Sequence, residues 1–246
     1  MSELVCRIIT RVTVRLAALA AMFASLLPSA AMSSPEQLLT QAYSQVRKES
    51  AGTRYVAPQP SELEATEDLF VRLLQGYDAA SLGALASKGG WTLRSESNAG
   101  RSVVVVLELP ASRRGRGFYA FFNQGQHALQ APHVPSDKLT GEILLRYGDD
   151  SLPRALAWNS VPRSVADLAH LDRTDFIAFS RAFARVNPGE KIIQFHGFDS
   201  DRRKTNAAAE SAAIVSAGHS QPTRELRNAV GCMNLKVDSA TRLYGV

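Results

Sequence analysis

The chain contains little cysteine. Its 246 residues include only Cys6 and Cys232, and Cys6 lies in an N-terminal segment that we expect to be removed. One thiol would then remain, so no disulfide can form within the mature chain and a cysteine-based metal site is nearly excluded. Cys232 has no evident activating partner in the sequence and is interpreted as a buried apolar residue.

The sequence also lacks the motifs of several large enzyme classes. There is no Gly-x-Ser-x-Gly elbow, and Ser216 and His219 in "IVSAGHS" lack the strained turn that presents a serine nucleophile. Neither a Gly-x-x-x-x-Gly-Lys phosphate loop nor a dinucleotide fingerprint is present. Serine hydrolases and nucleotide-dependent enzymes are therefore disfavoured.

A strong net charge is missing as well. The formal net charge is +5, and the first 31 residues carry three arginines against one glutamate, so their removal leaves about +3. Proteins that recognise nucleic acid carry a larger, clustered basic excess. We therefore expect no nucleic-acid partner.

The N-terminal apolar run is too short for a comfortable membrane span. "LAALAAMFASLL", at residues 16–27, has 12 residues, whereas a spanning helix needs about 20. Three arginines precede this run, and Ser29 and Ala31 follow it at the spacing that signal peptidase needs. We expect residues 1–31 to be a signal peptide, which predicts a periplasmic or secreted protein with no stable membrane anchor. A retained N-terminal anchor is the alternative.

The remaining residues, 32–246, suffice for one sizeable hydrophobic core. We predict a single α/β domain, with a helical N-terminal layer at 32–90 and an α/β core at 91–246. In the layer, Ser34-Pro35 begins one helix and a capping box of Ser61 and Glu64 begins another. The core opens with a β-hairpin that turns through Asn98-Ala99-Gly100.

Short apolar runs alternate with helical patterns after residue 117. The runs are "GFYAFF", "HALQAP", "ALAWN", "KIIQFHGF" and "AAIVSAG". The predicted helices are "SDKLTGEILLRYG", "TDFIAFSRAFARV" and the shorter "QPTRELRNAVG". In the first, Ser136 is the expected N-cap, and Leu139, Ile143 and Leu144 are expected to share an apolar face. In the second, Phe176, Phe179 and Phe183 share a face.

This alternation predicts an α/β fold in which a mainly parallel or mixed sheet is covered by helices on both faces. Ligands bind beyond the carboxyl ends of the strands in such sheets. Two histidines, His133 and His196, stand at predicted strand ends, and Asp137 follows the first of them. Two imidazoles and a carboxylate are ligands that suit zinc and leave a position for an activated water. We therefore predict a zinc site at His133, Asp137 and His196.

Plainer roles for these three residues stay open. Asp137 can be a first-turn helix acid that is stabilised by the helix dipole. Each histidine can serve as a helix cap or support a ligand rather than bind the metal itself.

The order of "APHVPSDKLTGEILLRYG", "NSVPRSVADLAHLDRTDFIAFSRAF" and "IIQFHGF" resembles zinc-dependent amidohydrolases of the N-formylglutamate amidohydrolase type, which are related in fold to zinc carboxypeptidases. The resemblance covers residues 130–220. It implies that His133 and His196 bind zinc with Asp137 as a possible third ligand, and that Arg163 grips an anionic group of the substrate. Arg163 can equally pair with Asp167, four residues further on.

Metal-assisted hydrolysis also needs a general base. Zinc carboxypeptidases take theirs from a strand late in the chain, but the tail "NLKVDSATRLYGV" contains Asp238 and no glutamate. Glu210 is the candidate catalytic base, although it lies in a segment interpreted as helical surface. The sequence thus predicts an exported zinc-dependent hydrolase that cleaves an amide bond, in a peptide or a small amino-acid derivative, with a metal-activated water.

A non-catalytic alternative is a periplasmic binding protein for an anionic cell-envelope ligand. Its evidence is the cluster of Arg113, Arg114 and Arg116 beside the aromatic residues of "GFYAFF". Stoichiometric metal bound through the histidines separates the two hypotheses, because only the enzyme needs it.

Overall fold

The computed structural model describes residues 34–49, 54–150, 153–197, 199, 201, 213–216, 223–234 and 243–245. These residues belong to two compact units, of which one holds the described residues up to Gly197 and the other holds those after Phe198. The expected signal peptide and Glu210 lie outside the described residues.

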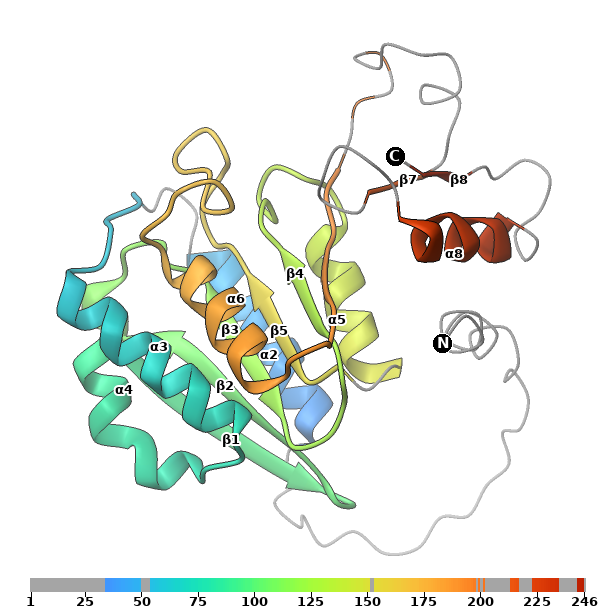
Figure 1. Ribbon diagram of the computed structural model, residues 1–246. Coiled ribbons are helices and arrows are strands. Elements are labelled where there is room, and N and C mark those ends of the chain that lie inside the picture. Colours follow the sequence, from blue (N-terminus) through green and yellow to red (C-terminus); the bar gives the residue numbers. More distant parts are fainter. Residues whose placement is uncertain are drawn as a thin grey trace, which may run out of the picture. The chain divides into compact units, whose positions relative to one another are not determined.

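A six-stranded mixed sheet organises the first unit, in the order β1-β2-β3-β5-β4-β6 (Figure 1). The strands are β1 (Trp91–Asn98), β2 (Arg101–Glu108), β3 (Phe118–Phe122), β4 (Ala128–Ala131), β5 (Ala155–Trp158) and β6 (Ile192–Gln194). β1, β2, β3 and β5 pair antiparallel, whereas β4 runs parallel to both β5 and β6. The predicted α/β class is confirmed, with the parallel part confined to three neighbouring strands.

The predicted hairpin joins β1 and β2. Asn98 pairs with Arg101, which leaves Ala99 and Gly100 as a two-residue turn with φ of 50° and 81°. Two successive positive φ angles are the geometry that matches the right-handed twist of paired strands. Gly100 adopts this backbone without strain because it has no Cβ.

Helices cover both faces of the sheet. α2 (Pro35–Glu49) and α5 (Thr140–Asp150) lie on one face, while α3 (Pro60–Leu74), α4 (Gly83–Gly89) and α6 (Asp175–Val186) lie on the other (Figure 1). Alternate residues of the strands serve the two cores: Phe118 and Phe122 pack with α2, whereas Tyr119 and Phe121 pack with α3 and α6. The two N-terminal helices, expected as one peripheral layer, are therefore separated by the sheet.

α3 begins earlier than the expected capping box. Gln59 is its N-cap, and the backbone N–H of Gln59 donates to the Glu62 carboxylate at 2.7 Å. Pro60 stands at the first helical position, where its missing N–H costs nothing. The capping box is thus Gln59 with Glu62, and the predicted box at Ser61 and Glu64 is wrong.

α5 begins later than predicted. Its first residue is Thr140 rather than a residue next to Ser136, because Leu139 has a φ of 66°, which a right-handed helix cannot include. Leu144 is fully buried, but the side chain of Leu139 is 67% exposed and that of Ile143 is 37% exposed. Leu139, expected on one helix face with Ile143 and Leu144, therefore lies before the helix, and only Leu144 of the three is buried.

α6 follows its sequence pattern. Thr174 caps the helix by accepting a hydrogen bond from the Ile177 N–H, and Phe176, Phe179 and Phe183 are fully buried. The helix ends at Val186, directly before the Asn187-Pro188-Gly189 stop. This helix fixes one wall of the core beside the parallel strands.

The arginines between β2 and β3 all have intramolecular carboxylate partners. Arg113 pairs with Glu49 of α2, and Arg114 pairs with Glu62 of α3. Arg116 pairs with Asp175 of α6 at 2.6 Å, and both side chains are only 1% exposed. These contacts tie the β2–β3 segment to three helices, so each of the three charges has a structural partner.

The second unit is described separately. Its β7 (Ala213–Val215) pairs parallel with β8 (Leu243–Gly245), and α8 covers Arg224–Asn234. Cys232 forms a disulfide in this full-length chain. The expectation of a lone thiol concerned the chain without residues 1–31 and stays a prediction. Among the residues that the structure describes in either unit, no helix has both the length and the apolarity of a membrane span.

Candidate metal site

The candidate site lies where the three parallel strands end. His133 follows β4, His196 follows β6, and the segment 159–170 follows β5. Because β5, β4 and β6 are neighbours that run in the same direction, their carboxyl ends share one edge of the sheet. This edge, where ligands of such sheets bind, thus collects side chains from three separate parts of the sequence.

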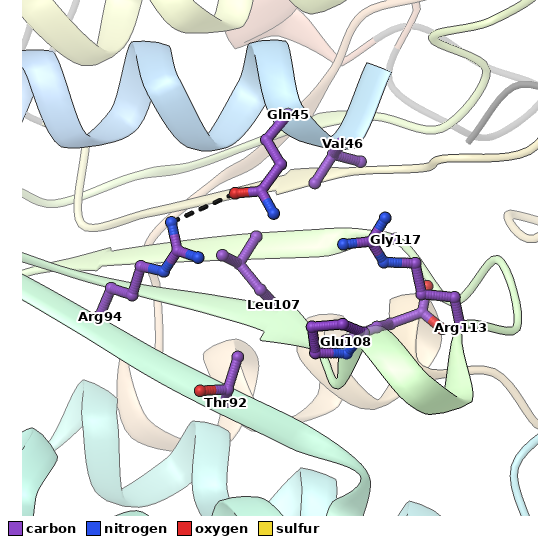
Figure 2. A pocket seen from close by; sticks show the side chains of 9 residues that line it. Gln45, Val46, Thr92, Arg94, Leu107, Glu108, Arg113 and Gly117 are labelled. Carbon is purple, nitrogen blue, oxygen red and sulfur yellow. Dashed lines mark hydrogen bonds between the residues drawn. The ribbon is translucent and has the colours of Figure 1, made fainter. Parts of the chain in front are cut away.

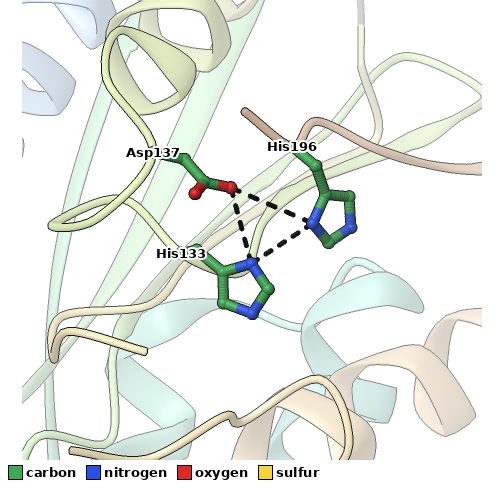
Figure 3. A group of neighbouring side chains, drawn as sticks. All are labelled: His133, Asp137 and His196. Atoms are coloured by element: carbon green, nitrogen blue, oxygen red, sulfur yellow. Dashed lines mark hydrogen bonds and ion pairs between the residues drawn. The ribbon is translucent and has the colours of Figure 1, made fainter. Parts of the chain in front are cut away.

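His133, Asp137 and His196 come together there, and their ligand atoms point toward a common centre (Figure 3). The Nδ1 atoms of the two histidines are 3.2 Å apart. Asp137 Oδ2 lies 3.5 Å from Nδ1 of His133 and 4.0 Å from Nδ1 of His196. This group of three side chains can hold a metal ion.

These spacings can be compared with a tetrahedral zinc site. Zinc–nitrogen bonds of about 2.05 Å place neighbouring ligand atoms about 3.3 Å apart. Two of the three separations lie close to that value. The third is longer, and a small movement of one side chain would bring it to that value. The His133 side chain is 1% exposed and that of His196 is 39% exposed, so the cluster has a closed side and an open side.

The other nitrogen of His133 faces a carboxylate. Nε2 lies 2.9 Å from Asp167 Oδ1, and Asp167 also accepts hydrogen bonds from His170 Nδ1 at 2.9 Å and from Arg163 Nε at 3.0 Å. A carboxylate can only accept, so Nε2 of His133 carries a proton, and in the neutral ring Nδ1 is then a lone pair. Histidine ligands of metals are commonly held in this way.

His133, Asp167 and His170 form a second group that can hold a metal ion. Both groups include His133. The first group lies at its Nδ1 atom and the second at its Nε2 atom. The 2.9 Å contacts in the second group are ordinary hydrogen bonds, and the Arg163 guanidinium already neutralises the Asp167 carboxylate. A cation there would lie beside a fixed positive charge, whereas no arginine or lysine among the described residues forms an ion pair with Asp137.

Asp137 reaches the centre because the chain turns back after β4. The backbone N–H of Asp137 donates to the His133 carbonyl at 2.7 Å, and the Gly197 N–H donates to Asp137 Oδ2 at 2.8 Å. A Cβ on Gly197 would lie 3.2 Å from the Cβ of Asp137, so only glycine permits this approach without movement. The four-residue gap between histidine and aspartate is therefore compatible with a shared site.

The surroundings shift the pKa of two groups at the site, Asp167 and His196. Burial acts to raise the pKa of Asp167, but hydrogen bonds from His133 and His170 outweigh it and lower that pKa below its ordinary value. Burial, followed by the proximity of His133, lowers the pKa of His196. His196 is thus disposed to be neutral at physiological pH, and a neutral imidazole is the form that binds metals.

Arg163 lies at the rim of the cluster. Its Nε donates to Asp167, its backbone N–H donates to Ser136 Oγ at 2.9 Å, and its side chain is 56% exposed. The pairing with Asp167 that the sequence left open is therefore present. Contact with a substrate anion remains a prediction for Arg163, as general-base catalysis does for Glu210.

Sequence reasoning missed Asp167, His170 and Gln194 as parts of the site. Asp167 was considered only as a partner of Arg163. The signal that could have found Asp167 and His170 is their position after β5, the third strand whose carboxyl end lies at the same edge.

A small pocket elsewhere in the same unit contains none of these residues. It lies between α2 and the β1–β2 hairpin, where Arg94 donates to Gln45 at 3.2 Å (Figure 2). Its lining also includes Arg113 and Glu108. Arg113 pairs with Glu49, and Glu108 accepts the backbone N–H groups of Arg114 and Arg116. The charged side chains of this pocket thus have partners within the protein.

Comparison with known proteins adds no relative. No protein-family model, curated protein or solved structure matches the chain. The function is therefore argued from the geometry of the site itself.

Proposed function

We propose that the protein is an exported zinc-dependent hydrolase that cleaves an amide bond in a peptide or an amino-acid derivative. The observation that carries this proposal is the convergence of His133, Asp137 and His196 at the carboxyl ends of parallel strands, with one side open to solvent. A bound zinc ion would polarise an amide carbonyl and lower the pKa of a coordinated water.

The donor set favours zinc over the harder divalent cations. Two imidazole nitrogens and one carboxylate oxygen suit zinc, whereas calcium and magnesium take mainly oxygen ligands. Three protein ligands also leave a fourth position free, which distinguishes a catalytic site from a closed structural one.

The chain's own residues have separate tasks in this proposal. Buried His133 would hold the cation on the closed side of the cluster, and Asp137 would supply a negative charge that offsets part of the cation's charge. His196 stands on the open side, next to the space that a substrate would enter. Arg163, with its side chain exposed at the rim, is available to orient an anionic substrate group.

The first test is metal content, measured by elemental analysis of the purified protein and of the His133→Ala and His196→Ala variants. We expect about one zinc per chain in the parent and little in either folded variant. His127→Ala is the matched control, since His127 pairs with Glu190 rather than with the cluster. Zinc-dependent hydrolysis of N-acyl amino acids or short peptides would then support the enzyme. A parent that takes up no zinc at neutral pH would refute the proposal.

The alternative of a non-catalytic binding protein has no comparable support. The arginines that favoured an anionic ligand are Arg113, Arg114 and Arg116, and each pairs with a carboxylate of this chain.

A further inference from the structure

Gln130 is an unusual residue for its position. It lies in β4, which has strand neighbours on both sides, and it is fully buried between apolar residues of the core. Glutamine is mostly exposed in proteins, and a buried amide needs partners for both of its ends. Both ends of Gln130 have one. Nε2 donates to Ser180 Oγ at 2.9 Å, and Oε1 accepts from Gln194 Nε2 at 2.8 Å.

These contacts have a direction that is set in helix α6. The Ser180 hydroxyl donates to the backbone carbonyl of Phe176 at 3.2 Å, and a carbonyl can only accept. The Ser180 oxygen is then left to accept from the amide nitrogen of Gln130. That contact orients the Gln130 amide, so its oxygen faces Gln194 and accepts from the Gln194 amide nitrogen.

The chain of contacts ends on a candidate metal ligand. With its nitrogen turned toward Gln130, Gln194 presents Oε1 to His196 Nε2 at 3.3 Å. An amide oxygen has no proton to donate, so this contact requires the proton to be on Nε2 of His196. In the neutral ring Nδ1 of His196 is then unprotonated, and it is the atom that faces His133.

We propose that Ser180, Gln130 and Gln194 are positioning residues that hold His196 in the tautomer with its proton on Nε2. Asp167 holds His133 in the same tautomer from the opposite side of the cluster. Two unprotonated nitrogens 3.2 Å apart and a carboxylate oxygen then face one another. With both rings neutral and in this tautomer, the lone pairs of these atoms repel one another, and a cation would relieve that repulsion. The arrangement therefore explains how the fold prepares this place for a metal.

This inference rests on the metal site of the proposed function but not on hydrolysis. It is tested first on the metal-free protein, by long-range ¹H–¹⁵N NMR correlation of the histidine side chains, which reports which ring nitrogen carries the proton. We expect the Nε2–H tautomer for His196 in the parent. In Gln194→Leu, which removes the acceptor, we expect a mixture of tautomers. A parent His196 with its proton on Nδ1 would overturn the inference, whether or not the protein binds zinc.

The second readout is the zinc dissociation constant, from competition with a chelating dye. Loss of an oriented hydrogen bond to a histidine ligand weakens metal binding by about 10- to 100-fold, which we expect for Gln194→Leu. Ser180 is the member of this hydrogen-bond series that lies farthest from His196, so Ser180→Ala should weaken zinc binding less. Ser180→Thr keeps the hydroxyl and should bind zinc like the parent. Arg181→Ala is the control. Arg181 is next to Ser180 but pairs with Glu67, which takes no part in this series of hydrogen bonds. Folded Gln194→Leu protein with unchanged tautomer and zinc affinity would also overturn the inference.

Discussion

Asp167 offers a sharp test of the metal site because its two oxygens have different partners. Oδ1 accepts from His133 and His170, and Oδ2 accepts from Arg163. Asparagine has nearly the same shape but only one accepting oxygen, and its amide nitrogen is a donor. Asp167→Asn therefore keeps the packing and forces a choice between these partners.

Either orientation of the new amide breaks a contact. If the amide oxygen faces His133, the NH₂ group meets the Nε–H of Arg163, and two donors face each other. If the amide is turned over, its NH₂ faces His133 Nε2, which must then accept and move its proton to Nδ1. The second orientation removes the lone pair that a metal needs.

We expect Asp167→Asn to weaken zinc binding by about 10- to 100-fold, as for other partners of histidine ligands. That change corresponds to about 1.4 to 2.8 kcal/mol of binding free energy. Asp167→Asn combined with Arg163→Ala should recover part of the loss, because the oxygen can then face His133 without opposition. Asp172→Asn is the matched control, since it makes the same change at an exposed position of the same loop.

The assay is competition of the protein with a chelating dye for zinc at pH 7.5, with circular dichroism to show that each variant is folded. Zinc affinity that is unchanged in folded Asp167→Asn would refute the argument that Asp167 orients His133. Equal losses in Asp167→Asn and in the double variant would show that the conflict with Arg163 is not the cause.

Three further predictions concern stability and the geometry of the site. Asp175→Ala leaves the Arg116 guanidinium buried without its counter-charge, and urea unfolding should show a loss of about 3–5 kcal/mol, whereas small values would contradict an intact buried pair. The pKa of Glu62 is lowered chiefly by its hydrogen bond from Arg114, so Glu62 contributes stability above its ordinary pKa of about 4.3 and loses it as the pH falls. Glu62→Gln should therefore lower the melting temperature by a few degrees at pH 7 but not at pH 3, and an equal effect at both would exclude this cause. Gly197→Ala should weaken zinc binding by up to about tenfold by displacing the carboxylate of the cluster, with little change in melting temperature; unchanged zinc affinity would show that the loop adapts.

Several features of the fold were predictable because their causes are local. The Phe176, Phe179 and Phe183 spacing predicted a buried helix face, and all three of these residues are buried in the structure. The hairpin turn at 99–100 followed from its glycine and the flanking strand patterns. Such signals depend on residues within one turn or one strand pair, which the sequence displays directly.

The elements that were mispredicted depend on longer-range effects. The late start of α5 depends on the positive φ of Leu139, which no leucine favours intrinsically and which the surrounding chain imposes. The opposite faces taken by α2 and α3 depend on how the strands divide their side chains between two cores. Neither effect leaves a local pattern in the sequence.

The sequence by itself determined that this is an α/β chain and that His133 and His196 follow apolar strands. Both features can be recognised from residues that are close together in the sequence. Only the tertiary structure decided that these strands are neighbours in a parallel set, which brings Asp137, Asp167 and Gln194 around the two histidines. Hydrogen bonds between atoms more than 30 residues apart, such as His133 to Asp167 and Gln130 to Gln194, orient the rings. The direction of those bonds follows from which atoms can donate, and that depends on packing across the whole sheet.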